Sequence, residues 1–406
     1  MGKTEQLVPK LRFPGFEGEW ERNPLIKVVE KPISYGIVQA GVHIENGMPY
    51  IKSQDLNRPL ELHLLQRTSF EIAHKYRRSE VTPGDIIFSL RGNIGVSQLL
   101  PQSIKVANLT QGTARISVSK HFSNRFVQLS LQTEKAIRIV NAAAKGSTFQ
   151  EISLEALRKV QIDLPTLPEQ EKIAGFLSSV DTKLQQLRAK KDLLSQYKKG
   201  LMQQLFSGEL RFKDEKGKDF PDWEEKRLGD VAEIVGGGTP DTLVDAFWDG
   251  GISWFTPTEI SERFVGKSKR TISKLGLEKS SAKMLPTGTI LFTSRATVGQ
   301  VSFASEPCCT NQGFQSLIAN KAANKEFLFY WIIQNKKEFL RKSQGSTFLE
   351  ISKNEMVKIG LNIPSLAEQQ KIATFLSALD KKIETVGAEI AGLTEWKKGL
   401  LQQLFV

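Results

Sequence analysis

The amino-acid sequence predicts an α+β chain in which two similar mixed α/β domains are separated by two long helices, which pair as an antiparallel coiled coil with pseudo-twofold symmetry. Three observations lead to this fold class: an internal repeat with an offset of 199 residues, heptad spacing of apolar residues in both copies, and short strand-like runs broken by Gly and Pro elsewhere. The predicted domains cover residues 1–164 and 207–363, and the predicted helices cover 165–206 and 364–406.

The internal repeat is ungapped. Of the 61 residues from 146 to 206, 30 are identical to those from 345 to 405, whereas ordinary residue usage gives agreement at about one position in sixteen. The block is therefore duplicated. Three motifs occur twice: Gly-Ser-Thr-Phe-x-Glu-Ile-Ser at 146–153 and 345–352, Glu-Gln-x-Lys-Ile-Ala-x-Phe-Leu at 169–177 and 368–376, and Lys-Lys-Gly-Leu-x-Gln-Gln-Leu-Phe at 198–206 and 397–405.

The repeat is cyclically phased. Leu-Arg-Phe follows the first copy at 210–212, and the same three residues stand near the N-terminus at 11–13. The N-terminal segment thus supplies the continuation that the second copy lacks. We expect the two ends of the chain to lie near the place where the first repeat joins the second.

Both shared blocks carry heptad patterning. Apolar residues recur with 4-3 spacing from Ile173 to Leu205 and again in the second copy, and Lys191, Lys198 and Lys397 occupy steps that would otherwise be apolar. A heptad pattern of this length favours a coiled coil, and about 38 residues give a rod of roughly 55–60 Å. The alternative is that each helix lies on its own globular domain, but two matched copies favour pairing of one helix with the other.

The two remaining blocks are related more weakly. Residues 83–95 resemble 286–299, and residues 108–112 resemble 309–313. Both blocks contain short β-branched and aromatic runs between turn residues, as expected for strands. We therefore expect one fold with two different surfaces.

Composition indicates a reduced, cytoplasmic protein with a polyanionic partner. The chain has 56 Lys+Arg against 44 Asp+Glu, a net charge of +12 and a pI near 9.5. The two cysteines, Cys308 and Cys309, are adjacent and cannot form a disulfide framework. No apolar run approaches the roughly 18 residues of a membrane span, and the N-terminus has no apolar leader.

Catalytic motifs are not found in the sequence. There is no P-loop, no Asn/Asp-Pro-Pro-aromatic motif of an adenine methyltransferase, and Gly236–Gly238 is followed by Thr-Pro, which favours a turn. The four histidines, at 43, 63, 74 and 121, lack the spacing of metal ligands. We predict a chain without catalytic residues, bound metal or cofactor.

Double-stranded DNA is the predicted partner. Arg and Gln recur at matching positions of the two blocks, and Arg, Gln and Asn can each make two hydrogen bonds to a base edge in the major groove. Basic clusters suit phosphate contacts. The alternative for each matched arginine is that it anchors a turn, and a basic cluster can be a solvated face. The predicted DNA-binding residues are Lys52, Gln54, Arg77, Arg78, Arg91, Asn93, Gln111, Thr256, Thr258, Lys269, Arg270, Arg295, Thr297 and Gln312.

The three repeated motifs resemble those of the specificity subunit of type I restriction-modification systems. The resemblance covers the whole chain in organisation and the helical blocks in detail, with the small departure that Ala367 stands where the first copy has Pro168. It implies that each domain is a target recognition domain for one half of a split DNA sequence and that the helices are a spacer. It also implies partners: two modification subunits carrying S-adenosylmethionine and the adenine methylation chemistry, and restriction subunits, the translocase-nucleases, that bring ATP and magnesium.

Two other functions stay open at the level of sequence. One is a self-contained DNA nuclease or methyltransferase with an unfamiliar site, and the other is a coiled-coil scaffold that binds only protein. A DNA-binding chain with two domains leads to two further predictions. Two groove-facing modules on one face of B-DNA lie about one turn, ~34 Å, apart. Because the two domains differ in sequence, the target should not be palindromic.

Overall fold

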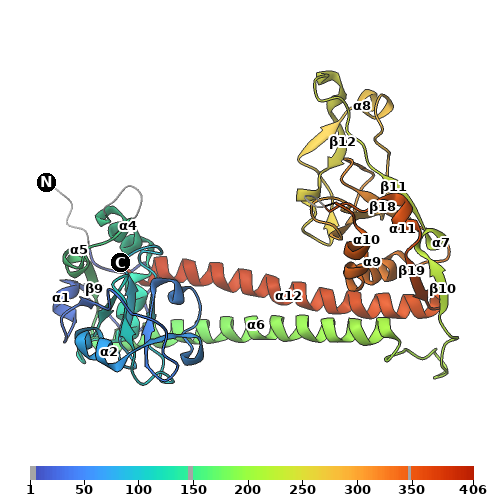
Figure 1. Ribbon diagram of the computed structural model, residues 1–406. Helices are drawn as coiled ribbons and strands as arrows, with labels where there is room; N and C mark the ends of the chain where they lie inside the picture. Colours follow the sequence, from blue (N-terminus) through green and yellow to red (C-terminus); the bar gives the residue numbers. More distant parts are fainter. Residues whose placement is uncertain (1–5, 145–149, 346–348) are drawn as a thin grey trace. The chain divides into compact units, whose positions relative to one another are not determined.

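The computed structural model describes residues 6–144, 150–345 and 349–406. The chain divides into two compact units, of which unit 1 contains residues 1–188 and 388–406, and unit 2 contains residues 189–387. Each unit has a globular part, made of its sheets and short helices, and one half of each long helix (Figure 1).

The globular part of unit 1 is built on three small sheets. A four-stranded sheet has the order β2-β8-β5-β6, a three-stranded sheet has the order β4-β3-β7, and β1 pairs with β9. The ladders are antiparallel except for β3 with β7. The strands are β1 (Glu21–Pro24), β2 (Ser34–Tyr35), β3 (Met48–Ile51), β4 (Gln66–Thr68), β5 (Ile86–Ser89), β6 (Ser97–Leu99), β7 (Asn108–Leu109), β8 (Thr113–Ile116) and β9 (Gln161–Leu164).

Unit 2 repeats this topology strand for strand and adds one strand. Its sheets have the orders β11-β18-β15-β16-β13, β14-β12-β17 and β10-β19. Here β13 is the strand without a counterpart among the described residues of unit 1. The strands are β10 (Glu224–Arg227), β11 (Ala232–Gly236), β12 (Trp248–Phe255), β13 (Phe264–Val265), β14 (Arg270–Ile272), β15 (Ile290–Phe292), β16 (Val301–Ala304), β17 (Cys309–Thr310), β18 (Gln315–Ala319) and β19 (Gly360–Ile363). The expectation of one fold used twice is confirmed.

Short helices also correspond between the units. Several are capped by side chains that accept a backbone N–H, among them Ser123 before α3 and Asn324 before α9. The helices are α1 (Leu25–Val28), α2 (Phe70–Lys75), α3 (Asn124–Leu131), α4 (Glu134–Ala143) and α5 (Leu154–Lys159) in unit 1, and α7 (Leu228–Val231), α8 (Lys274–Glu278), α9 (Lys325–Gln334), α10 (Lys336–Lys342) and α11 (Lys353–Val357) in unit 2.

The two long helices are α6 (Leu167–Ser207) and α12 (Leu366–Leu404). They pair in each unit, and the pairing is antiparallel: within unit 2, Lys191 lies beside Gly387 and, further along α6, Lys198 bonds Asp380. The fold-class prediction of paired helices is confirmed. None of the described helices has the length and hydropathy needed to cross a bilayer.

Each globular part packs on both long helices. The core of unit 1 includes Ile173 and Leu177 from α6 and Leu400 and Leu404 from α12. The core of unit 2 includes the corresponding apolar residues of the other helix halves. The heptad residues therefore serve two surfaces, because part of each apolar stripe faces the sister helix and part faces a sheet domain.

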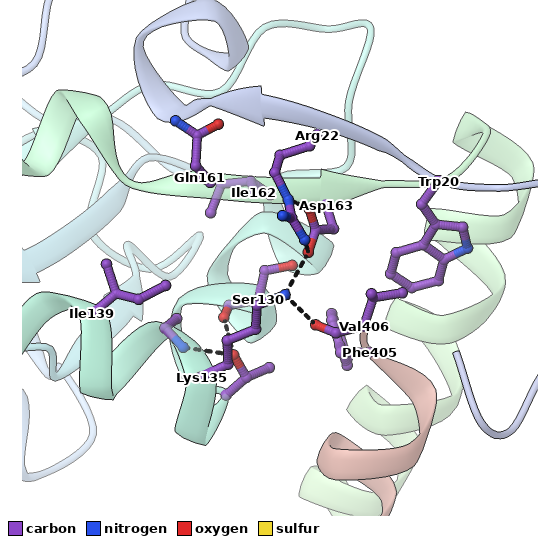
Figure 2. A pocket seen from close by; sticks show the side chains of 12 residues that line it. Trp20, Arg22, Ser130, Lys135, Ile139, Gln161, Ile162, Asp163, Phe405 and Val406 are labelled. Carbon is purple, nitrogen blue, oxygen red and sulfur yellow. Dashed lines mark hydrogen bonds and ion pairs between the residues drawn. The ribbon is translucent and has the colours of Figure 1, made fainter. Parts of the chain in front are cut away.

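The N-terminal Leu-Arg-Phe segment lies against the end of α12 within unit 1. The Leu11 N–H donates to the Gln403 carbonyl at 2.9 Å, and the ring centroids of Trp20 and Phe405 lie 6.2 Å apart (Figure 2). In unit 2 the same bond joins Leu210 to Gln204 at 3.0 Å within a continuous chain. The contact between Leu11 and Gln403 in unit 1 is therefore equivalent to the contact at the junction of the repeats in unit 2.

Candidate nucleic-acid interface

The repeated Glu-Gln pair at the start of each long helix forms a joint. Arg12 donates to both carboxylate oxygens of Glu169 at 2.8 Å, and Arg211 does the same to Glu368 at 3.1 and 2.8 Å. The two glutamates are 1% and 0% exposed. The hydrogen bond to Glu368 raises the pKa of the Arg211 guanidinium. This pair ties the Leu-Arg-Phe segment to the long helix in each unit.

The glutamine that follows ties the long helix to the globular part. The Gln170 side chain accepts from the Ser123 N–H at 3.0 Å and donates to the Pro165 carbonyl at 2.8 Å. Gln369 makes the same two contacts, to Asn324 and Pro364. Both amides are 1% exposed, so each stabilises the first turn of its helix against the cap of a domain helix.

The repeated Glu-Ile-Ser segment also has a structural role. Ile152 and Ile351 are fully buried, and Ser153 accepts the Ala156 N–H at 3.1 Å to cap α5. Ser352 caps α11 in the same way. The preceding Gly-Ser-Thr-Phe of this motif lies outside the described residues, apart from Gly345. The residues shared by the two repeats thus hold the frame, and the residues that differ are free to form distinct surfaces.

A large open cavity lies on the globular part of unit 1. Its volume is about 1240 Å³, and it is lined by five of the predicted DNA-binding residues: Lys52, Gln54, Arg91, Asn93 and Gln111. They come from the end of β3, the short 3-10 helix that follows it (Ser53–Asn57), the β5–β6 turn and the β7–β8 turn. The structure therefore brings together side chains that are up to 59 residues apart in the sequence.

Close backbone approach builds this surface. A Cβ on Gly112 would lie 2.7 Å from the Ser53 hydroxyl, which donates to the Gly112 carbonyl at 2.9 Å. Glycine at this position lets the β7–β8 turn lie against the helix that carries Gln54. The neighbouring Gln111 is held by its backbone, since its N–H donates to the Ile37 carbonyl at 2.9 Å.

Two amides in the cavity are available to a ligand. Among the described residues, the side chains of Gln54 and Gln111 form no hydrogen bond, while both are at least partly exposed. A glutamine amide offers one acceptor and two donors, which matches the N6 and N7 edge of adenine. Lys52 donates to the Gln66 side chain at 3.0 Å and adds positive charge at the rim.

Other predicted residues are engaged within the protein. Asn93 accepts from the Ser89 hydroxyl at 2.6 Å and donates to Asn57 at 2.8 Å. Arg91 pairs with Glu151 at 3.2 Å, and Arg295 pairs with both oxygens of Glu350 at 2.7–3.0 Å. Both arginines therefore contact the glutamate of the repeated Glu-Ile-Ser segment. This matched pair favours the turn-anchoring alternative for Arg91 and Arg295 over direct base contact.

In unit 2 the predicted residues lie at equivalent positions with different partners. Thr256 donates to Glu259 at 2.8 Å and lies 3.0 Å from the Thr258 hydroxyl, at the start of the 3-10 helix Pro257–Glu259. Gln312 accepts a hydrogen bond from Thr239. Thr297 is exposed in the β15–β16 turn.

The residues of the two predicted basic clusters, Arg77 with Arg78 and Lys269 with Arg270, do not line the unit 1 cavity. Arg77 and Arg78 are exposed on the 3-10 helix Arg77–Ser79, where Arg78 lies over the Tyr35 ring at 5.6 Å. Lys269, just before β14, and Arg270, its first residue, are exposed, and Arg270 stacks on the Trp248 ring at 3.7 Å. Stacking holds a guanidinium in place without neutralising it, so Arg270 stays available for a phosphate.

The β15–β16 turn of unit 2 carries backbone strain. Ala296 has φ of 63°, whereas the equivalent position of unit 1 is Gly92 with φ of 79°. A left-handed conformation costs a residue with a Cβ about 1 kcal/mol. We expect Ala296→Gly to raise the free energy of unfolding by roughly 0.5–1 kcal/mol, as measured by chemical denaturation. A loss of stability would show that the alanine methyl group contributes packing that outweighs the strain.

Two exposed aliphatic residues were not singled out from the sequence. Val42 and Leu243 are 81% and 90% exposed, and each stands six residues after a glycine, Gly36 or Gly237, whose Cβ would clash with a backbone carbonyl. The loops are nevertheless anchored, for example by the bond from the Trp248 indole to the Asp241 carbonyl at 3.1 Å. From the sequence, only an alignment of the two blocks would have shown that Val42 and Leu243 stand at matching positions.

The structure gives no sign of a metal centre in the parts of the chain it describes, since no group of three His, Cys, Asp or Glu side chains there could hold an ion.

The sequence of the chain matches a known protein family. The family model described as "Type I restriction modification DNA specificity domain" matches twice, at residues 19–196 and 221–395. The chain belongs to this family. The resemblance drawn from the repeated motifs is confirmed.

Individual relatives agree with the family assignment. The MjaIX specificity subunit of Methanocaldococcus jannaschii is 37% identical over 185 residues, which is 44% of this chain and 43% of that protein. The MjaVIII specificity subunit of the same organism is 23% identical over 387 residues, covering 90% of this chain and 87% of that protein. The first match thus spans less than half of the relative's length.

A solved structure shows the same fold. The type I restriction-modification S subunit from M. genitalium aligns with a TM-score of 0.61 at 17% identity, covering 98% of this chain and 99% of that one. At this identity the likeness concerns the arrangement of the elements, not the residues that face a ligand.

Proposed function

We propose that this specificity-family chain is the DNA-recognition subunit of a type I restriction-modification complex and catalyses no reaction itself. Two target recognition domains, residues 1–164 and 207–363, each recognise one half of a bipartite, non-palindromic target in double-stranded DNA. The paired helices, 165–206 and 364–406, set the separation of the half-sites. We also propose, from the composition, that the protein is cytoplasmic.

The observation that carries the proposal is that repeated residues have structural roles, whereas unrepeated residues line the open cavity. Repeated residues such as Glu169 and Gln170 are buried in joints. The open cavity of unit 1 instead presents the free amides of Gln54 and Gln111. A frame used twice with two different faces is what recognition of two different half-sites requires.

Charge and shape support DNA as the ligand. The net charge of +12 favours a polyanion, and exposed Arg77, Lys269 and Arg270 suit phosphate contacts. The exposed Val42 and Leu243 would lose their contact with water where DNA covers their loops. In this assignment Arg91, Asn93 and Arg295 position the turns rather than bases, and Lys52, Thr256, Thr258, Thr297 and Gln312 stay candidates for direct contact.

The proposed partners are two modification subunits and, for cleavage, restriction subunits. S-adenosylmethionine, ATP and magnesium would then be bound by those subunits. Support comes from the family, whose members belong to type I enzymes. We place the docking of the modification subunits on the helices and the adjoining domain faces.

The purified chain should separate recognition from catalysis. We expect it to transfer no methyl group to DNA with S-adenosylmethionine and magnesium, and to do so only when modification subunits are added. Its affinity for duplex DNA, measured by fluorescence anisotropy, should fall steeply with salt because phosphate contacts release counterions. Methylation by the chain alone would favour the self-contained enzyme, and no DNA affinity at low salt with partners present would favour the protein scaffold.

A further inference from the structure

Each unit contains a carboxylate that joins three elements at once. In unit 1, Asp181 of α6 pairs with Lys397 of α12 at 2.7 Å and accepts a hydrogen bond from Arg125 of α3. Arg125 also donates to the Ser178 hydroxyl at 3.2 Å. One side chain thus links the two long helices to each other and to the globular part.

Unit 2 has the same arrangement at the equivalent positions. Asp380 of α12 binds Lys198 of α6, accepts from the Tyr330 hydroxyl of α9 at 2.6 Å, and lies 3.6 Å from Arg263. Arg263 donates to the Ser377 hydroxyl at 2.9 Å, as Arg125 does to Ser178. We call these two clusters the Asp181 hub and the Asp380 hub.

The arginine of the hub comes from a different part of the chain in each unit. In unit 1 it is Arg125, the second residue of α3, and the equivalent residue of α9 in unit 2 is Glu326. This reversal of charge is compensated by Arg263, which precedes the extra strand β13 and pairs with both Glu326 and Asp380. The two units have diverged in sequence and in one strand, yet each keeps a domain arginine on the same helix carboxylate.

The hubs lie at the far end of the contact between domain and helix. On α6 the glutamine joint is at Gln170, and Asp181 is eleven residues further along, about 16 Å at 1.5 Å per residue. Within the described residues of unit 1, no hydrogen bond or ion pair joins α6 to the globular part beyond Asp181. Two attachments this far apart resist pivoting of the domain on the helix far better than one.

We infer that Asp181 and Asp380 are positioning residues that fix the angle of each recognition domain on the helix pair and thereby limit the complex to one spacer length between half-sites. This inference rests on the proposed function. Neither carboxylate touches DNA in this scheme, so the bases of each half-site should not depend on them. What should change when a hub loses its charge is the tolerance for targets whose half-sites are too close or too far apart.

The test uses the full chain in complex with its modification subunits and a set of duplexes with fixed half-sites and spacers up to two base pairs shorter or longer than the native one. For wild type we expect methylation at one length. For Asp181→Asn, and separately for Asp380→Asn, we expect the preference over neighbouring lengths to fall about tenfold, with half-site bases unchanged. Arg125→Gln should behave like Asp181→Asn, because it removes only the contact made by the domain.

Two controls make the outcome decisive. Lys397→Arg keeps the cation and should retain the wild-type preference, and Glu355→Gln, which breaks an exposed pair on α11, should do so too. Unchanged spacer preference in folded Asp→Asn and Arg125→Gln variants overturns the inference, as does an equal loss of methylation at every length. If the wild-type complex itself shows no spacer preference, the bipartite function fails and not the hub alone.

Discussion

Glu368→Gln should lower the free energy of unfolding by about 3 kcal/mol, the low end of the cost of breaking a buried ion pair. Glu368 is fully buried and accepts two hydrogen bonds from Arg211, which is 27% exposed. The glutamine fills the same space but turns an N–H donor toward a guanidinium donor, and among the described residues it leaves the arginine with only the exposed Asp222 carboxylate, 3.8 Å away, as an ion-pair partner. Chemical denaturation followed by circular dichroism measures the change.

The control for this substitution is Glu355→Gln. Glu355 pairs with Lys358 at 3.2 Å on the surface of α11, and such a pair contributes about 0–1 kcal/mol. Equal effects of the two substitutions would contradict the role of Glu368 as a joint between the Leu-Arg-Phe segment and α12.

Gln111→Ala should weaken discrimination at one base pair of a single half-site by about 10–100-fold, equivalent to about 1–3 kcal/mol. Its amide lines the cavity of unit 1 and is not used within the described part of the chain. Gln54→Ala should act on the same half-site for the same reason. Competition binding with single-base variants of the target, performed on the assembled complex, measures both effects.

Gln102→Ala is the matched control for these two substitutions. Gln102 is exposed in unit 1 but does not line the cavity, so its truncation should leave discrimination unchanged. If Gln111→Ala altered both half-sites equally, the assignment of one half-site to each domain would be incorrect.

The repeat allowed the frame to be predicted from sequence. Heptad spacing is a local signal, and two copies of it predicted two long helices, which the structure shows as α6 and α12. Lys198 and Lys397 were visible as interruptions of the apolar pattern. Their partners, Asp380 and Asp181, depend on how the two antiparallel helices align, which the heptad pattern of each helix does not specify.

The state of each candidate site residue could not be predicted in the same way. Arg91 and Gln111 are both polar residues in turns, but Arg91 meets a carboxylate 60 residues later in the chain, and Gln111 meets none. Whether a side chain is free for a ligand depends on such distant partners, which spacing along the sequence does not encode. For the same reason, the pairing of Arg263 with Glu326 could not be predicted from the sequence.

Mapping methylated adenines across a genome, with and without this chain and with its modification subunits present, tests the central claim most directly. The account predicts methylation at one bipartite, non-palindromic sequence with a constant spacer, lost when the chain is deleted. Methylation that persists without the chain, or that marks a contiguous palindrome, would contradict it.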